Sequence, residues 1–272
     1  MFNASSSWWR PTPSFTGQPI APGRDANVYA PGKSCASFTT PNCKIEFDEQ
    51  TLARAQIRPN DTVIEFGARY GTTSCAIAEA QQNSGRLVVV EPDARAHEAL
   101  MRNRVHNRCS FHAVFGTVGR LPVHLATLSP FHFNQATKVS RTGMASLPNF
   151  PFRSIEAEIG SQFNVALVDC EGCFRNSVWD SGLINQLRLV ILEEDGGRRS
   201  AREWHKMLHG AGFVRVWNAY DHADRGWGNH SAWVRASSPS AARATGSPSC
   251  THYRKLRKIH PRHLPCVDSD EK

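Results

Sequence analysis

The order of apolar and polar positions divides most of the chain into short segments of two kinds. Brief apolar runs predict buried strands, and apolar residues at helical spacing predict helices. The predicted strands cover residues 62–66, 86–90, 111–115, 164–168, 187–192, 214–219 and 231–234. The predicted helices cover residues 48–57, 72–82, 94–105 and 200–209. Strands that alternate with helices indicate βαβ units and a parallel sheet, and the last two strands predict an antiparallel hairpin.

Several side chains and glycines mark where the predicted helices begin and end. Asp93 is placed to cap the helix over 94–105, and Thr72 or Thr73 to cap the helix that follows the first strand. Gly210 and Gly212 are placed to end the helix over 200–209. These signals agree with the periodic pattern.

The pattern predicts one α/β domain with a loose segment on each side. Residues 1–44 are rich in Pro, Gly, Ser and Thr and predict a loose arm, and residues 236–272 predict a basic, disordered tail. Residues 45–235 then hold a doubly wound, mostly parallel seven-stranded sheet with a C-terminal antiparallel hairpin. Between 116 and 159 the pattern is least regular: it indicates a strand over 121–125 and a Pro/Ser/Thr-rich loop over 138–151. A loop of that length near an active face is often functional.

The distribution of charge changes this picture little. The net charge is +8, of which the seven Lys/Arg and three Asp/Glu of residues 236–272 supply +4. The body is therefore only mildly basic, which argues against a nucleic-acid binder as a whole, although the tail leaves such a contact open. No apolar run approaches the roughly 18 residues that span a bilayer, and no secretory signal is recognised. A cytoplasmic location is the default expectation, and the oligomeric state is not indicated.

The eight cysteines do not form a zinc pattern. Cys170 and Cys173 make a lone CxxC, without the second pair that a zinc site needs. Cys75 and Cys170 fall in predicted core elements, where cysteine behaves as a small hydrophobe. We expect structural or incidental thiols, with a redox or metal role as the alternative.

The candidate ligand-binding residues begin at the turn between the first predicted strand and the helix that follows it. Gly67 and Gly71 allow the backbone to turn sharply and to approach a ligand closely. Glu91 lies at the end of the second strand, twenty positions after Gly71, where an acid reaches the ribose hydroxyls of a nucleoside.

Acidic residues at the strand ends indicate which nucleoside is bound. The glycine spacing is GxxxG rather than the GxGxxG that admits a pyrophosphate, and an acidic rim repels phosphate. The rim suits a ligand with a sulfonium and an ammonium group and no phosphate, which describes S-adenosylmethionine (SAM). The rim consists of Glu65, Glu91, Asp169, Glu171, Glu193, Glu194 and Asp195.

Four segments resemble the motifs of FkbM-type SAM-dependent methyltransferases. Residues 58–71 resemble the first motif, a strand and an acid followed by Gly-Ala-x-x-Gly. Residues 88–93 resemble the second, Glu-Pro before a helix, and residues 167–172 resemble the third, Asp-x-Glu-Gly after the fourth strand. Residues 192–194 resemble the acidic end of the fifth strand. The likeness covers about residues 48–235, with Glu65 where the family more often has Asp.

The resemblance implies a class I methyltransferase-like fold and a set of SAM contacts. Glu65, Gly67 and Gly71 would surround the methionine part, Glu91 would hold the ribose, and the end of the third strand would lie near the adenine. The implied cofactor-binding residues are Glu65, Gly67, Ala68, Gly71, Thr72, Glu91, Pro92, Phe115, Gly116 and Asp169.

Two carboxylates are the candidate catalytic residues. The resemblance implies that Asp169 and Glu171 sit beside the methyl donor, and if the strand continued through both, they would point the same way. One pKa of such a pair would rise, and that residue would serve as base or orient the acceptor. The alternative is that they only shape the loop and hold the amine of the cofactor. No metal is predicted; the alternative is Mg²⁺ bound by Asp169 with Glu193 or Glu194, because hard cations prefer carboxylate oxygens.

These observations predict an enzyme that methylates a hydroxyl on a small or sugar-like acceptor. The preference for this acceptor comes from the family resemblance alone, because the fold does not determine it. The alternatives are a non-catalytic module of the same fold with a basic tail, and an NAD(P)-dependent oxidoreductase.

Overall fold

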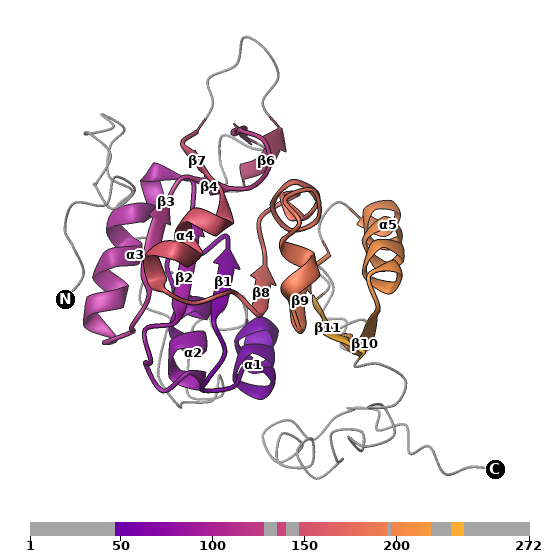
Figure 1. Cartoon of the computed structure of the whole chain (residues 1–272). Helices are drawn as coiled ribbons and strands as arrows, with labels where there is room; N and C mark the ends of the chain where they lie inside the picture. The colour runs from indigo at the N-terminus through magenta and orange to yellow at the C-terminus, as the bar shows by residue number, and fades with distance from the viewer. Residues whose placement is uncertain (1–46, 128–134, 140–146, 195–196, 219–229, 237–272) are drawn as a thin grey trace.

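The computed structural model describes residues 47–127, 135–139, 147–194, 197–218 and 230–236 (Figure 1). The predicted N-terminal arm lies outside the described residues, as do the predicted basic tail from residue 237 onward and Asp195 of the acidic rim. Among the described residues, no helix has the length and apolar character to cross a membrane. The cytoplasmic location stays a prediction.

The main sheet has seven strands in the order β10-β11-β9-β8-β1-β2-β3. The pairs among β9, β8, β1, β2 and β3 are parallel, whereas β11 runs antiparallel to both β9 and β10. The strands are β1 (Val63–Phe66), β2 (Leu87–Glu91), β3 (His112–Phe115), β8 (Val165–Val168), β9 (Leu189–Glu193), β10 (Phe213–Asn218) and β11 (His230–Arg235). The predicted mostly parallel sheet with a C-terminal antiparallel hairpin is confirmed.

Helices cover both faces of this sheet, as a doubly wound fold requires. They are α1 (Phe47–Gln56), α2 (Thr72–Ala80), α3 (Ala94–His106), α4 (Phe152–Ile159) and α5 (Gly197–Gly210) (Figure 1). Along β1, Val63 packs in one apolar cluster with residues of α1, α2 and α3, whereas Ile64 and Phe66 pack in the other with residues of α4 and α5. Successive strand residues face opposite sides, so a strand buried on both faces becomes one continuous apolar run. For this reason the strands of the main sheet could be predicted from the apolar runs in the sequence.

The sequence pattern did not predict α4. Pro151 precedes its first residue, and Gly160 follows its last residue with a φ of +67°. Proline before a helix and a left-handed glycine after it are ordinary boundary signals, so the information was present. The helix is only eight residues long, and the irregular residues before it hid its period.

The segment between β3 and α4 forms two small two-stranded sheets. β4 (Thr117–Val118) pairs with β7 (Asn149–Phe150), and β5 (Val123–Thr127) pairs with β6 (Gln135–Val139). The strand expected over 121–125 thus begins two residues later. In Figure 1 both pairs lie at the end of the main sheet toward which β1 points. Part of the predicted loop over 138–151 lies outside the described residues.

At the opposite end of the sheet, a partly buried ion pair joins Asp61 and Arg188. Asp61, which precedes β1, accepts hydrogen bonds from the Arg188 guanidinium, from Asn164 Nδ2 at 2.9 Å and from the Arg58 backbone amide at 2.7 Å. Asn164 in turn accepts a bond from the Thr62 amide at 2.9 Å. These residues precede β1, β8 and β9, so the network joins the starts of three neighbouring strands.

An Asp61→Ala variant is expected to lower the free energy of unfolding by about 3 kcal/mol, because it leaves a partly buried guanidinium without its carboxylate. Urea denaturation followed by circular dichroism measures this change. Glu98→Ala is the control, since its pair with Arg102 is exposed and should contribute less than about 1 kcal/mol. Equal stabilities of the two variants would contradict the structural role of Asp61.

Candidate functional site

The turn between β1 and α2 brings two backbone segments into direct contact. Gly67 has a φ of +95°, and a Cβ added there would lie 1.6 Å from the Asp169 backbone oxygen. The Gly67 and Ala68 amides both donate to the Val90 carbonyl, at 2.9 and 3.2 Å. Only a glycine permits so close an approach of the residues after β1 to those after β8. Gly71 also has a positive φ, of +83°, at the entry to α2.

The start of α2 differs from the expected threonine cap. The residue before the helix is Gly71, and no side chain caps the first turn. Instead, the Thr73 hydroxyl donates a hydrogen bond of 2.9 Å to Glu49 of α1. The predicted cap is therefore wrong, because a tertiary partner takes the hydroxyl. Thr72, one of the predicted cofactor contacts, is half-buried at this helix start.

Glu91 holds the glycine turn against the start of α3. One of its carboxylate oxygens accepts the Arg69 amide at 2.6 Å, and the other accepts the Asp93 amide at 2.7 Å. Its side chain is buried at the end of β2, and this burial raises the pKa of Glu91 to about 7 although both amide bonds lower it. A carboxylate has about four acceptor positions, so Glu91 can accept further hydrogen bonds beside these two.

The raised pKa of Glu91 has a cost for stability. Because the pKa lies above its ordinary value of 4.5 in the folded chain, the folded state loses stability as the pH rises from about 4.5 to about 7. A buried acid that destabilises the fold at neutral pH is characteristic of functional sites. The sequence predicted the position of Glu91, but not that it organises the turn.

An aromatic pair lies beside Glu91, where the adenine was expected. Phe115, opposite Glu91 in the strand register, stacks on His97 of α3 with ring centroids 3.9 Å apart. His97 Nε2 lies 2.8 Å from the Glu91 carbonyl oxygen, and burial lowers the pKa of His97, which favours the neutral form of the ring. A Cβ on Gly116 would lie 2.6 Å from the Pro148 carbonyl oxygen, so the segment around Pro148 packs over this end of β3.

Sequence reasoning missed His97. Its position as the fourth residue of the helix that follows Glu-Pro-Asp was a signal, but an isolated histidine does not by itself indicate a function. Pro92 is half-buried between Glu91 and this helix.

The two candidate catalytic carboxylates follow β8 but do not continue its strand. β8 ends at Val168, the Asp169 amide donates to the Phe66 carbonyl at 2.9 Å, and Glu171 has a left-handed φ of +51°. The side chains are therefore not related as residues i and i+2 of a strand. Burial raises the pKa of Glu171, the charge of Asp169 raises it further, and Arg69 lowers it.

The other described residues of the acidic rim lie in or after the strands at the edge of the sheet where the parallel strands end. Glu65 is buried in β1, two residues before Gly67, and Glu193 is the last residue of β9, opposite His230 in the register. Glu194 is also buried and pairs with His205 of α5 at 2.7 Å, a partner that the sequence did not predict. Within the described ranges, no three His, Cys, Asp or Glu residues are grouped so as to hold a metal ion.

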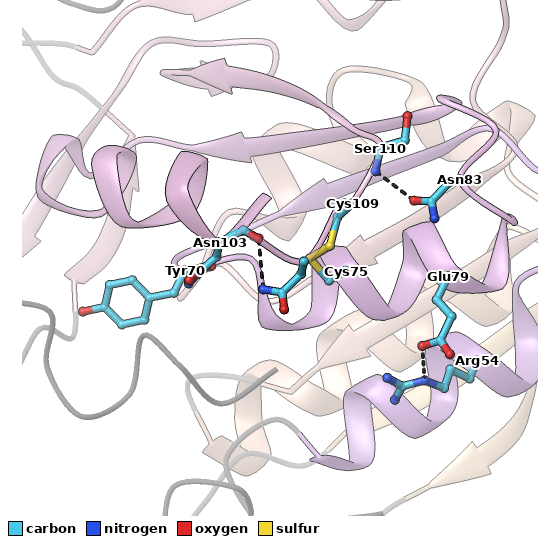
Figure 2. The surroundings of a disulfide bond; sticks show 9 residues. Arg54, Tyr70, Cys75, Glu79, Asn83, Asn103, Cys109 and Ser110 are labelled. Atoms are coloured by element: carbon cyan, nitrogen blue, oxygen red, sulfur yellow. Dashed lines mark hydrogen bonds and ion pairs between the residues drawn. A yellow bond between two sulfur atoms is a disulfide. The ribbon is translucent and has the colours of Figure 1, made fainter. Parts of the chain in front are cut away.

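Two disulfides replace the thiols expected from the sequence. Cys75 of α2 is bonded to Cys109, which precedes β3, and Figure 2 shows this bond beside the Asn103 amide that donates to the Tyr70 carbonyl. Cys170 is bonded to Cys173 and lies beyond the end of β8 rather than in it. The interpretation of Cys75 and Cys170 as unpaired small hydrophobes is therefore wrong. Cys75 and Cys109 are 34 positions apart, so only the fold shows that they meet.

Neither a protein-family model nor a curated protein sequence matches the chain. Solved structures similar to it include proteins named as methyltransferases, at low sequence identity. The O-methyltransferase TomG from Streptomyces achromogenes, in complex with SAM, is 15% identical over 72% of this chain and 83% of that one, with a TM-score of 0.43. An O-methyltransferase from Bacillus cereus, in complex with S-adenosylhomocysteine (SAH), is 12% identical over 74% and 84%, with a TM-score of 0.44. An rRNA methylase from Streptococcus thermophilus is 5% identical over 70% and 95%, also with a TM-score of 0.44.

Proposed function

We propose that the chain is a SAM-dependent methyltransferase of the FkbM type, which methylates a hydroxyl on a small, sugar-like acceptor. The observation that carries the proposal is the edge formed by four neighbouring strands, β2-β1-β8-β9. Glu91 ends β2, Asp169 follows β8 and Glu193 ends β9, while β1 between them runs into the Gly67–Gly71 turn. This edge is acidic, and ligands of doubly wound sheets bind at the carboxyl ends of the strands.

The chemistry of these side chains fits a cationic nucleoside. Burial raises the pKa of both Glu91 and Glu171, which means that their negative charges are poorly compensated. A ligand with an ammonium and a sulfonium group would stabilise both charges, whereas the pyrophosphate of NAD(P) would add negative charge to the same edge. Glu91 is the residue proposed for the ribose. Phe115 and Gly116 are proposed for the adenine, and Glu65 with the turn residues for the methionine part.

SAM, when bound, supplies a methyl group on a sulfonium for in-line transfer to an acceptor oxygen. The protein contributes a base. Glu171 is proposed to take the hydroxyl proton, because its raised pKa makes it a better proton acceptor than an ordinary carboxylate. Asp169 is proposed to orient the acceptor and, through its charge, to keep the pKa of Glu171 high. The acceptor class itself rests on the family resemblance.

Calorimetric titration with SAM, SAH, NAD⁺ and NADP⁺ tests the cofactor. We expect micromolar binding of SAM and SAH, and a loss of at least about 100-fold in Glu91→Ala, which removes both the ribose acceptor and the anchor of the turn. Glu98→Ala on the exposed side of α3 is the matched control and should bind as the wild type does. Binding of a dinucleotide alone would indicate the oxidoreductase, and no binding by the folded protein would indicate the non-catalytic module.

The same titration at several pH values measures how the ionisation of Glu91 contributes to SAH affinity. With a pKa of about 7 and binding to the ionised form, SAH affinity should be about tenfold weaker at pH 6 than at pH 8. Glu91→Gln carries no charge at either pH, so its weaker affinity should change much less between the two. A pH dependence that persists unchanged in Glu91→Gln would assign the titration to another group.

A further inference from the structure

The two disulfides of the described chain occupy different environments. Cys75 and Cys109 are both buried, at 1% and 7% exposure, and their bond closes a long loop between α2 and β3. The Cys170–Cys173 bond closes a loop with a sequence separation of only 3. Cys173 is 5% exposed, but Cys170 is only half-buried. Cys170 is therefore the most exposed of these four cysteines, whereas both cysteines of the other disulfide are buried.

The short disulfide encloses one of the proposed catalytic residues. Between the two cysteines lie Glu171, with a φ of +51°, and Gly172, with a φ of +105°. A left-handed conformation is unfavourable for a glutamate in an open chain, so it is maintained by its surroundings. The covalent closure at Cys170 and Cys173 supplies such a constraint, and it holds Glu171 near the charges of Asp169 and Arg69.

The loop also contacts the proposed cofactor turn. The position of a Cβ on Gly67 is 1.6 Å from the Asp169 carbonyl oxygen and 3.4 Å from Cys170 Cα. No atom separates the backbone at Gly67 from the residues that begin the disulfide loop. A movement of residues 169–173 must therefore be accommodated by the residues that follow β1.

We propose that Cys170–Cys173 is a reversible thiol–disulfide exchange site for low-molecular-weight thiols and that its redox state controls the proposed methyltransferase site. The control of activity rests on the proposed function, whereas the exchange chemistry does not. The oxidised state holds Glu171 in place for methyl transfer. The reduced state releases the 169–173 loop and lowers both the affinity for SAH and the rate of transfer.

Reduction of the Cys170–Cys173 bond takes place in two successive thiol–disulfide exchange reactions. A thiolate attacks the Cys170 sulfur, the bond to Cys173 breaks, and Cys173 leaves as a thiolate that takes up a proton. A second thiol then attacks the mixed disulfide and releases Cys170 as a thiol together with an external disulfide. Two external thiols are oxidised to one disulfide, and the protein disulfide is reduced by two electrons to two thiols. A low-molecular-weight disulfide reverses both steps.

Graded reduction of the folded, full-length protein with dithiothreitol tests the exchange site. Differential alkylation and mass spectrometry measure the oxidation state of each cysteine pair, and circular dichroism monitors the fold. We expect Cys170–Cys173 to be reduced at concentrations that leave Cys75–Cys109 oxidised and the spectrum native. Reduction of Cys170–Cys173 only together with Cys75–Cys109, or only on unfolding, would overturn the proposal.

Hydrogen–deuterium exchange and SAH calorimetry then test the control of the site. In the selectively reduced protein, amides of residues 169–173 should exchange at least tenfold faster, and SAH affinity should fall at least fivefold. A Cys170→Ser/Cys173→Ser variant should match the reduced protein and should not respond to dithiothreitol. Unchanged amide exchange on reduction, or unchanged SAH affinity in a protein that binds SAH, would overturn the proposal. If no state binds SAH, the proposed function fails, and alkylation with amide exchange still decides the exchange site.

Discussion

A Gly67→Ala variant is expected to lose SAH affinity by more than about 100-fold and to unfold with a free energy lower by about 3 kcal/mol. Two effects act together. The φ of +95° is unfavourable for alanine, and the added Cβ would lie 1.6 Å from the Asp169 carbonyl oxygen. The atom in contact is backbone, so it cannot move aside as a flexible side chain does. The ends of β1 and β8 must separate, and the proposed cofactor site lies at that point.

Gly210→Ala is the matched control for this variant. Gly210 is the last residue of α5, and a Cβ there would meet no atom within 4 Å. Alanine in a helix is favoured over glycine by up to about 1 kcal/mol, so the control should be neutral or slightly more stable. Urea denaturation and SAH calorimetry provide both measurements. Wild-type stability and SAH affinity in Gly67→Ala would contradict the close approach of the two strand ends.

Glu171→Gln is expected to lower kcat by about 10²- to 10⁴-fold while SAH affinity stays within about threefold of the wild type. The amide keeps the shape of the carboxylate but cannot accept the proton of the acceptor hydroxyl. The measurement is steady-state methyl transfer to a hydroxyl compound that the wild type methylates in an acceptor screen, combined with SAH calorimetry. The comparison of kcat with affinity separates a base from a residue that holds the cofactor.

Two further variants complete this test. Asp169→Asn should lower kcat less than Glu171→Gln does, because Asp169 is proposed to act on the pKa of Glu171 and on acceptor orientation. Glu203→Gln, an exposed carboxylate on α5 that pairs with Arg175, should leave kcat within about twofold. If Glu171→Gln lost SAH affinity and kept kcat, the two acids would only shape the loop and hold the amine of the cofactor.

Much of the architecture could be predicted because buried strands and helices have characteristic patterns of apolar residues in the sequence. β8 is buried on both faces and consists of consecutive apolar residues, and so does β1 apart from the buried Glu65; β8 is followed by an acid and β1 by a glycine. The cap at Asp93 was also predictable, since its side chain accepts the amide of Arg95 only two positions away. The end of α5 near Gly210 follows from the same local rules. In each case the partners are close in sequence, so local preference and tertiary structure agree.

Tertiary contacts decided the features that local rules placed wrongly. Thr73 was an acceptable cap for α2, but Glu49 of α1 takes its hydroxyl. Cys75 resembled a small core hydrophobe, yet α2 places it beside Cys109. Glu49 and Cys109 are each more than twenty positions away from their partners. The periodic pattern of apolar residues therefore does not predict either contact.

The sequence by itself determined the seven strands of the main sheet and the helices other than α4, the glycine turn and the acids that follow the strands. These features depend on residue type and spacing. Only the tertiary structure decided how Glu91 is used, because its two backbone partners come from different loops and its pKa depends on burial. It also decided that the chain after β8 turns at Glu171 within a disulfide loop instead of continuing as a strand. Burial, backbone conformation and cross-links arise from the packing of distant segments, and a linear pattern of residues does not contain them.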